Sequence, residues 1–304
     1  MVQADLMDDT KRTNRQVDHI SVPVLRWTLL DLPGVSLKNS LNKCWFHAGL
    51  HLLSAIPNLR SLCLLPPQDL SMFERRFLNA VRAIFHTRRS ADVGLFFPLV
   101  RDFCGVNNRY GQVAVPDFIE YLCARSPTLS PVVKLGFTTQ LQCSKCQWVS
   151  QRMCNDVSLK HIPPGRDQVT LSDLVDYNSN VVLTDTDAVF RGHCNLKTSH
   201  TLSRDYNPDL FLMEVVRVTE SSRNTWVKNN ASLSFPVTDL ILPGFSRSYR
   251  VSTCHHRGSL NGGHWLTKRS TNHGWFDSDD LKAKNLRVTD NSVTIILVIA
   301  EDKL

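Results

Sequence analysis

The sequence contains no run of apolar residues long enough to cross a membrane. Its longest strand-like apolar run, Val293–Ala300, has the length of a buried strand rather than of a transmembrane helix. The first residues, 1–12, are too polar to form the apolar core of a secretory signal. We therefore expect no membrane among the partners and a location in the cytoplasm or nucleus.

The sequence also lacks the pattern of a nucleic-acid-binding surface. The formal net charge of +7 favours acidic partners in general. However, lysine and arginine residues form no compact block and do not alternate with aromatic residues. We therefore expect no nucleic acid among the partners. A zinc-stabilised nucleic-acid binder, which the pair Cys143 and Cys146 would suit, is the weaker alternative for the same reason.

The chain shows no internal repeat and no low-complexity tract, and 42% of its 304 residues are hydrophobic, enough for a sizeable core. Residues 1–24 are polar with mixed charge, which predicts a flexible N-terminal segment. Helical spacing of apolar residues predicts helices at 45–56, 67–87, 91–103 and 116–123. Short alternating runs predict strands at 133–142, 157–162, 188–190, 210–218, 232–235, 249–255 and 292–300. The order predicts an α+β fold with a cleft between a helical lobe and a β region.

One of the nine cysteines is a candidate nucleophile. With no secretory route visible, we expect the cysteines to be reduced thiols, metal ligands or a nucleophile rather than disulfides. Cys44 follows an Asn-rich segment and opens an apolar run, 45–56, that predicts a buried helix with Asn39 or Asn42 near its cap. The helix dipole and Lys43 would favour the thiolate. A buried structural cysteine is the alternative.

A cysteine nucleophile requires a base, and the base requires a group that orients it. Among the eleven histidines, His264 follows Gly262 and Gly263, whose backbone would allow close approach in an active-site loop. The segment Trp275–Asp280 carries several carboxylates, one of which could accept the imidazole N–H. Taken alone, Gly-Gly-His suits an ordinary loop equally well, and the acidic segment suits a solvated turn.

The order of these features resembles the ubiquitin-specific protease family. The family's cysteine box, Gly-Leu-x-Asn-x-Gly-Asn-x-Cys-Tyr-x-Asn, aligns with residues 36–47, which keep the leucine, both asparagines and the cysteine but neither glycine. The histidine box aligns with 262–265, and the Trp-aromatic-x-Phe-Asp-Asp motif with 275–280. Two intermediate strands of the family are similar to 157–163 and 207–217. The resemblance therefore covers the chain from about residue 25 to its last residue, in the family's order.

The resemblance implies a papain-like cysteine protease with thumb, palm and fingers around one cleft. The thumb would span residues 25–130, and the palm 131–304 with fingers at about 137–205. Such an enzyme is a thiol isopeptidase that hydrolyses the bond after the C-terminal Gly-Gly of a ubiquitin-type modifier, without a cofactor for catalysis. An inactive, modifier-binding pseudoprotease is an alternative from another class, although the chain retains both the cysteine and the histidine.

The resemblance also assigns roles to single residues. Cys44 would be the nucleophile, His264 the general base and Asp279 the residue that orients it. Asn39 matches the family's oxyanion-hole side chain. Two further acids of the same turn would support or replace Asp279, namely Asp280 and Asp277.

The implied contacts to the modifier's tail depart from the family at one position. The family's helix motif Gln-x-Asp-Ala-x-Glu-Phe aligns with residues 112–118, where Asp117 replaces the usual glutamate and Ala114 replaces the first aspartate. The missing carboxylate would weaken a charge-assisted contact with the arginines that precede Gly-Gly in ubiquitin. The implied tail-binding residues are Gln112, Asp117, Gly262 and Gly263.

The choice of modifier stays open at this point, with ubiquitin slightly favoured because most of the family acts on it. SUMO, or both modifiers, is the alternative. Ala114 favours it, because the SUMO tail has no such arginines, and the basic net charge suits an acidic SUMO surface. Cys44-Trp45 together with Asp279–Lys282 also has some resemblance to the SUMO-directed branch of the family.

A structural zinc is also possible from the sequence. Cys143-Ser-Lys-Cys146 is half of a zinc ribbon, whose second half the family often places about 40 residues later. Here Cys194 is present, but Lys197 occupies the place of the fourth cysteine. Because zinc accepts imidazole, the candidate ligands are Cys143, Cys146, Cys194 and His200, with His193 or Cys154 as substitutes. Fingers that have lost the metal are the alternative.

Overall fold

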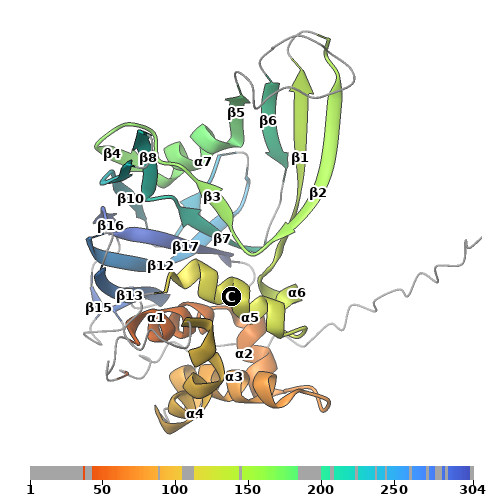
Figure 1. Ribbon diagram of the computed structural model, residues 1–304, viewed down its shortest axis with the longest axis vertical. Coiled ribbons are helices and arrows are strands. Elements are labelled where there is room, and N and C mark those ends of the chain that lie inside the picture. Colours follow the sequence, from red (N-terminus) through yellow and green to blue (C-terminus); the bar gives the residue numbers. More distant parts are fainter. Residues whose placement is uncertain are drawn as a thin grey trace, which may run out of the picture.

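The computed structural model describes residues 37, 43–87, 90–104, 113–143, 146–183, 200–205, 209–222, 225–236, 238–243, 245–259, 262–271, 274–277, 283–284 and 287–301. In these parts of the chain, helices from the first half lie against one large sheet, and a narrower sheet extends away from it (Figure 1). The structure is therefore a mixed α+β fold, as the sequence predicted.

Local signals set the boundaries of the helices. Pro57 is the first residue of its helix, where its missing N–H would have no partner in any case. Ser71 and Glu74 form a capping box at the start of the next helix. The helices are α1 (Cys44–Leu53), α2 (Pro57–Leu64), α3 (Met72–Arg82), α4 (Ser90–Val100), α5 (Val115–Arg125), α6 (Ser130–Val133) and α7 (Leu171–Ser179). A π-helical turn, Ala83–Thr87, follows α3, and a 3-10 turn, Arg101–Cys104, follows α4.

The large sheet has the strand order β15-β14-β13-β12-β17-β7-β3, with β11 paired to β12. All of these pairs are antiparallel except β3–β7. The strands are β3 (Leu159–His161), β7 (Leu210–Val215), β11 (Leu240–Ile241), β12 (Ser248–Ser259), β13 (Gly262–Thr271), β14 (Gly274–Asp277), β15 (Ala283–Lys284) and β17 (Val293–Ala300).

Three smaller groups of strands surround this sheet. The narrow sheet has the order β2-β1-β6-β5, with β1 (Leu135–Cys143), β2 (Val149–Asp156), β5 (Asn180–Leu183) and β6 (His200–Asp205). A three-stranded sheet has the order β16-β10-β4, with β4 (Gln168–Thr170), β10 (Ser232–Pro236) and β16 (Arg287–Asp290). Strands β8 (Val218–Ser222) and β9 (Thr225–Lys228) form a separate hairpin.

Strand β17 is central because it carries both hydrophobic cores. Ile295, Leu297 and Ile299 belong to the core that the helices of the first half form against the sheet. Ile296 and Val298 alternate to the other face and join the core that contains α7 and β10. A strand that is buried on both faces reads as a continuous apolar run, which explains why the sequence alone predicted it.

The predicted helices correspond to α1, α3, α4 and α5, but two details differ. The first helix ends at Leu53, and Pro57 begins a second helix rather than only ending the first. Its N-cap is Lys43, which makes no side-chain capping bond; Asn39 and Asn42, expected near the cap, lie outside the described residues. Helix α7 and strand β13 were not predicted. The expected strand at 188–190 lies outside the described residues.

None of the helices in the described parts of the chain combines the length and the apolar character that crossing a membrane requires.

The buried side chain of Glu74 joins α3 to the segment before α6. Its carboxylate accepts hydrogen bonds from the Ser126 hydroxyl at 3.2 Å and the Thr128 backbone N–H at 3.1 Å. It also accepts one from the Ser71 hydroxyl at 2.8 Å. Burial raises the pKa of Glu74, but the hydrogen bonds from Thr128 and Ser71 outweigh burial and lower the pKa to about 2.

This arrangement predicts a pH-dependent contribution of Glu74 to stability. Because its pKa is lower in the folded chain, the contribution is complete above the ordinary value of 4.5 and is lost as the pH falls toward 2. We expect Glu74→Gln to lower the free energy of unfolding at pH 7 by about 2 kcal/mol, and much less at pH 2. Urea unfolding at both pH values measures this difference. The exposed Asp69→Asn is the matched control, and an equal loss at both pH values would contradict the assignment.

Candidate active site

Cys44 is the first residue of α1, and its side chain is 4% exposed. The first hydrogen bond within the helix runs from the His47 N–H to the Lys43 carbonyl at 3.0 Å. The backbone N–H groups before His47 therefore have no acceptor within the helix and give the thiol a positive electrostatic environment. Burial, and then the charge of Lys43, lower the pKa of His47 to about 4, so this neighbour is neutral at pH 7.

Aromatic packing holds the first turn of α1 in place. Trp45 and Phe46 are buried, and the Trp45 ring lies 5.0 Å from the ring of Phe118 in α5. A Cβ at Gly49 would lie 2.7 Å from the Phe118 ring, so the close approach of α1 and α5 requires glycine there. The start of α5 is thereby fixed beside the helix that carries Cys44.

Two polar contacts fix the direction of α1 along β13. The Thr267 hydroxyl donates to the Ala48 carbonyl at 2.8 Å, and Arg269 Nη1 donates to the Ser54 hydroxyl at 3.2 Å. Helix α1 and strand β13 therefore run in the same direction. Cys44 lies about 6 Å before Ala48 along the helix, and His264 lies about 10 Å before Thr267 along the strand. The structure thus brings the candidate nucleophile and the candidate base to the same end of this contact.

His264 is half-buried and pairs with Arg257 of β12 in the sheet register. The preceding glycine is tightly enclosed, because a Cβ at Gly263 would lie 2.4 Å from the Arg257 carbonyl oxygen and 2.5 Å from His256 Nε2. The His256 ring also packs against Trp265 with centroids 4.7 Å apart. Gly263 thus permits a close approach of the backbone, but within strand β13 rather than in the loop that the sequence predicted.

His256 is a residue of this site that the sequence analysis missed. Burial lowers its pKa, with further contributions from the positive charges of Lys228 and His264. Its only sequence signal is a position two residues beyond Cys254 on a strand, where alternation places both side chains on one face. Cys254 is also buried, and burial raises the pKa of Cys254 to about 12. The charge of the nearby Cys44 adds to this rise.

A buried histidine–aspartate pair, His255 and Asp290, also lies in this region of the sheet. His255 is completely buried and lies 3.3 Å from Asp290, and its other ring nitrogen lies 2.7 Å from the Thr253 hydroxyl. Burial raises the pKa of Asp290, but the hydrogen bond and charge of His255 outweigh it and hold the pKa well below its usual range. Strand alternation directs His255 away from the face that carries Cys254 and His256. This pair ties β12 to the segment before β17.

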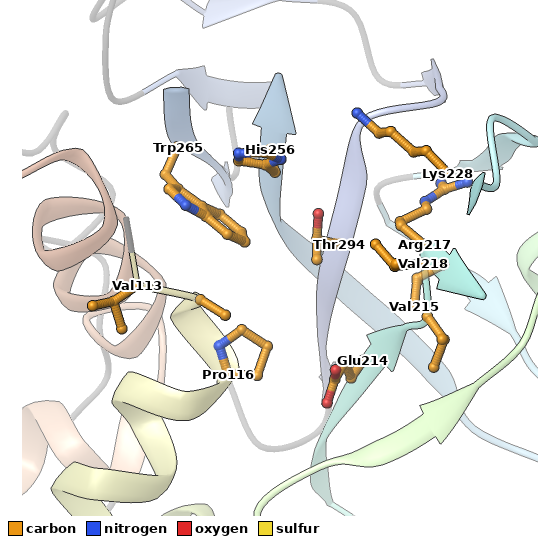
Figure 2. A pocket seen from close by; sticks show the side chains of 12 residues that line it. Val113, Pro116, Glu214, Val215, Arg217, Val218, Lys228, His256, Trp265 and Thr294 are labelled. Atoms are coloured by element: carbon orange, nitrogen blue, oxygen red, sulfur yellow. The ribbon is translucent and has the colours of Figure 1, made fainter. Parts of the chain in front are cut away.

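A groove leads to this end of α1 and β13. It has a volume of about 350 Å³. Figure 2 shows Val113 and Pro116 from the start of α5 on one wall and Val215 and Arg217 on the opposite one. Trp265 lies at one end, beside His256, and Glu214 lies at the other. Ala114 also lines this groove.

Several predicted site residues lie outside the described residues, so their places stay predictions. They are Asn39, Gln112, Cys194, Asp279 and Asp280. Asp277 ends β14, where its backbone pairs with Lys268. Asp117 is exposed in the first turn of α5. Gly262 pairs with Ser259 at the start of β13.

Three of the candidate zinc ligands, Cys143, Cys146 and His200, lie at one end of the narrow sheet. The Cys143 N–H donates to the Trp148 carbonyl at 2.9 Å, and the Gln147 N–H donates to the Cys143 carbonyl at 3.1 Å, which closes a tight turn around Cys146. On the other side of β1, His200 of β6 pairs with Cys143 in register. The described residues contain no cluster of three His, Cys, Asp or Glu residues suited to a metal. Two thiols and a neighbouring histidine position fit part of a tetrahedral site.

Comparison with known proteins identifies the fold and the family. Residues 122–298 match the model of a family described as ubiquitin carboxyl-terminal hydrolase. This range includes His264 and the β7 wall of the groove, whereas Cys44 precedes it. No curated protein matches the chain.

Among solved structures, the chain is similar to the SAGA DUB module of Ubp8 with Sgf11, Sus1 and Sgf73 bound to monoubiquitin. The two are 14% identical with a TM-score of 0.67, and the match covers 90% of this chain and 70% of that chain. At this identity the similarity shows the fold, which is the mixed α+β fold of that protease.

The enclosure of Gly263 generates a prediction for the reactivity of Cys44. In Gly263→Ala the new methyl group would displace the start of β13, and with it His264, from the end of α1. We expect alkylation of Cys44 by iodoacetamide at pH 7, followed by peptide mass spectrometry, to slow about tenfold. Gly165→Ala is the matched control, since nothing lies within 4 Å of a Cβ there. Unchanged alkylation in a folded Gly263→Ala protein would contradict this role.

Proposed function

The chain belongs to the ubiquitin carboxyl-terminal hydrolase family, and from this premise we propose that Cys44 and His264 hydrolyse the bond after the C-terminal Gly-Gly of ubiquitin. The family consists of cysteine-type deubiquitinases, so the reaction class follows from membership. The observation that supports the residue assignment is the shared direction of α1 and β13, since Cys44 and His264 both precede the contacts between these two elements.

The proposed chemistry uses this chain's own residues throughout. His264 accepts the thiol proton of Cys44, and the thiolate attacks the carbonyl carbon of the terminal glycine. The developing oxyanion accepts hydrogen bonds from backbone N–H groups at the start of α1 and from the Asn39 amide. His264 then protonates the departing amine, and water releases the acyl group from sulfur. Asp279 holds the imidazole in the tautomer that this cycle requires, with Asp280 in support.

The groove suits a narrow tail that ends in glycine. Trp265 and His256 close its end next to His264, and the backbone of Gly263 lies directly under the His256 ring. We assign the helices up to residue 130 to the thumb of the protease, the large sheet to its palm and the narrow sheet to its fingers. The tail would then lie between thumb and palm.

Ubiquitin is the proposed substrate rather than SUMO. The matching family is described by ubiquitin, and the solved relative is bound to monoubiquitin. Neither comparison supports the SUMO-directed branch. The rival from another class, a modifier-binding pseudoprotease, predicts binding of ubiquitin without turnover and is separated by the experiment that follows.

We expect Cys44→Ala to reduce hydrolysis of a fluorogenic ubiquitin conjugate by about 10³-fold or more, because the nucleophile is lost. His264→Ala should cause a loss of similar size. Cys154→Ala and His86→Ala are the matched controls, since these residues lie on β2 and after α3, away from the groove. Mass spectrometry after reaction with a ubiquitin C-terminal electrophile should locate the adduct on Cys44. An adduct on another cysteine, or turnover retained by Cys44→Ala, would refute the mechanism.

We further infer that a structural zinc holds the turn between β1 and β2 through Cys143 and Cys146, with Cys194 and His200 as the remaining ligands. The tight turn around Cys146 and the pairing of Cys143 with His200 support this set. A zinc ion would crosslink the strands there and take no part in the reaction.

Elemental mass spectrometry of the natively purified protein tests this inference. We expect about one zinc per chain, and its loss in Cys143→Ser with a lower melting temperature. Cys123→Ser, at a buried cysteine of α5, separates loss of metal from loss of stability. A zinc-free native protein would show that this turn is stable without metal.

A further inference from the structure

Glu214 brings a carboxylate into the groove from the wall opposite Ala114. It lies on β7, half-buried, in a strand whose neighbouring residues, Met213 and Val215, are fully buried. The side chain lines the groove together with Ala114 and Pro116 at the start of α5. Figure 2 shows Glu214 and Pro116 on the two elements, β7 and α5. At position 114 the sequence has alanine where the family has an aspartate. In the structure, the groove that Ala114 lines has an acid, Glu214, on its other wall.

The charges around Glu214 favour a cation. Burial raises its pKa, and the carboxylates of Asp117 and Glu120 on α5 add to this effect, while Lys160 opposes it. Lys160 is the paired residue of β3, whereas Asp117 and Glu120 belong to the helix at the opposite wall. Asp117, Glu120 and Lys160 thus act on Glu214 without lining the groove, while Arg217 and Lys228 line other parts of it. A positively charged ligand at Glu214 would relieve the repulsion among the three carboxylates.

The structure holds the neighbouring cation of the groove, Arg217, in a fixed position. Arg217 lines the same groove and is only 6% exposed. Its Nε donates to the Val293 carbonyl at 2.8 Å and its Nη1 to the Ala231 carbonyl at 2.5 Å, whereas its buried Nη2 has no hydrogen-bond partner in the described parts of the chain. A buried N–H group without an acceptor is costly. Arg217 thus forms part of the groove wall through a guanidinium group held by backbone carbonyl oxygens, which leaves Glu214 as the carboxylate that lines the groove among the described residues.

We propose that Glu214 is a specificity-determining residue that binds a basic side chain of the modifier's tail, a few residues before Gly-Gly, in place of the carboxylate absent at Ala114. The inference rests on the proposed function, because it takes the groove to hold the tail. Its consequence is that the groove selects the arginine-bearing tail of ubiquitin over a neutral tail, despite the loss of an acid from α5.

The test compares conjugates of ubiquitin with the native tail and with each tail arginine replaced in turn by glutamine. We expect Glu214→Gln to raise KM for the native tail about tenfold with kcat nearly unchanged. For one of the glutamine tails the same substitution should have no effect, because its partner is already absent. Asp176→Asn, at an exposed acid of α7, is the control for the change in net charge.

Moving the carboxylate back to the other wall provides a second, independent measurement. Glu214→Gln combined with Ala114→Asp should restore the low KM for the native tail, because both positions line one cavity. Ala114 is the N-cap of α5, where Asp and Asn stabilise a helix equally well. Glu214→Gln with Ala114→Asn therefore controls for capping and should leave KM high.

A loss in Glu214→Gln that is equal for all tails, or absent for all, would overturn the proposal while leaving the proposed function intact. A wild-type chain that turns over none of the conjugates would contradict the proposed function instead. The tails are then compared by the dissociation constants of unconjugated ubiquitin and its glutamine variants. A weaker binding of the native tail by Glu214→Gln, with no effect for one glutamine tail, supports the role of Glu214, and the lack of this difference rejects it.

Discussion

The candidate site depends on how helix α1 packs against strand β13. Every residue of α1 except His47 is buried, so the helix presents no single apolar stripe that would determine its rotation. Polar contacts determine it instead, because a buried hydroxyl or guanidinium group is costly without its partner. The Thr267 and Arg269 contacts to α1 satisfy such groups only in one alignment. The place of Cys44 therefore follows from the register of a strand far along the chain.

That register is itself held from both faces of the large sheet. From Ile295 onward the residues of β17 alternate between two filled cores, so a slip by one residue would exchange these side chains between them. The His255–Asp290 pair adds a buried polar link between β12 and the segment before β17. Strand β12 then carries β13 by direct pairing, and its His256 ring covers Gly263. Paired strands thus determine where His264 lies.

The sequence predicted the elements whose periodicity is strong. Helix α3 and strand β17 have regular apolar patterns, and the motif around Cys44 and the Gly-Gly-His segment marked the two candidate reacting groups. Strand β13 was missed because Lys268 and Arg269 interrupt its apolar pattern, and only the tertiary contact with Ser54 explains a buried arginine there. Alternation gives no way to see such a partner, because it lies more than two hundred positions away in the sequence.

Glu214 illustrates a different limit of sequence analysis. It lies within an apolar run that predicts a buried strand, and an acid in such a run has no meaning until the opposite wall is known. The groove has walls from α5 and from β7, two elements about a hundred residues apart, so its charge is a property of both together. A carboxylate lost from one wall can be replaced from the other without moving the cavity. The departure at Ala114, which the helix motif alone presents as a weakened contact, is therefore compatible with an undiminished preference for a basic tail.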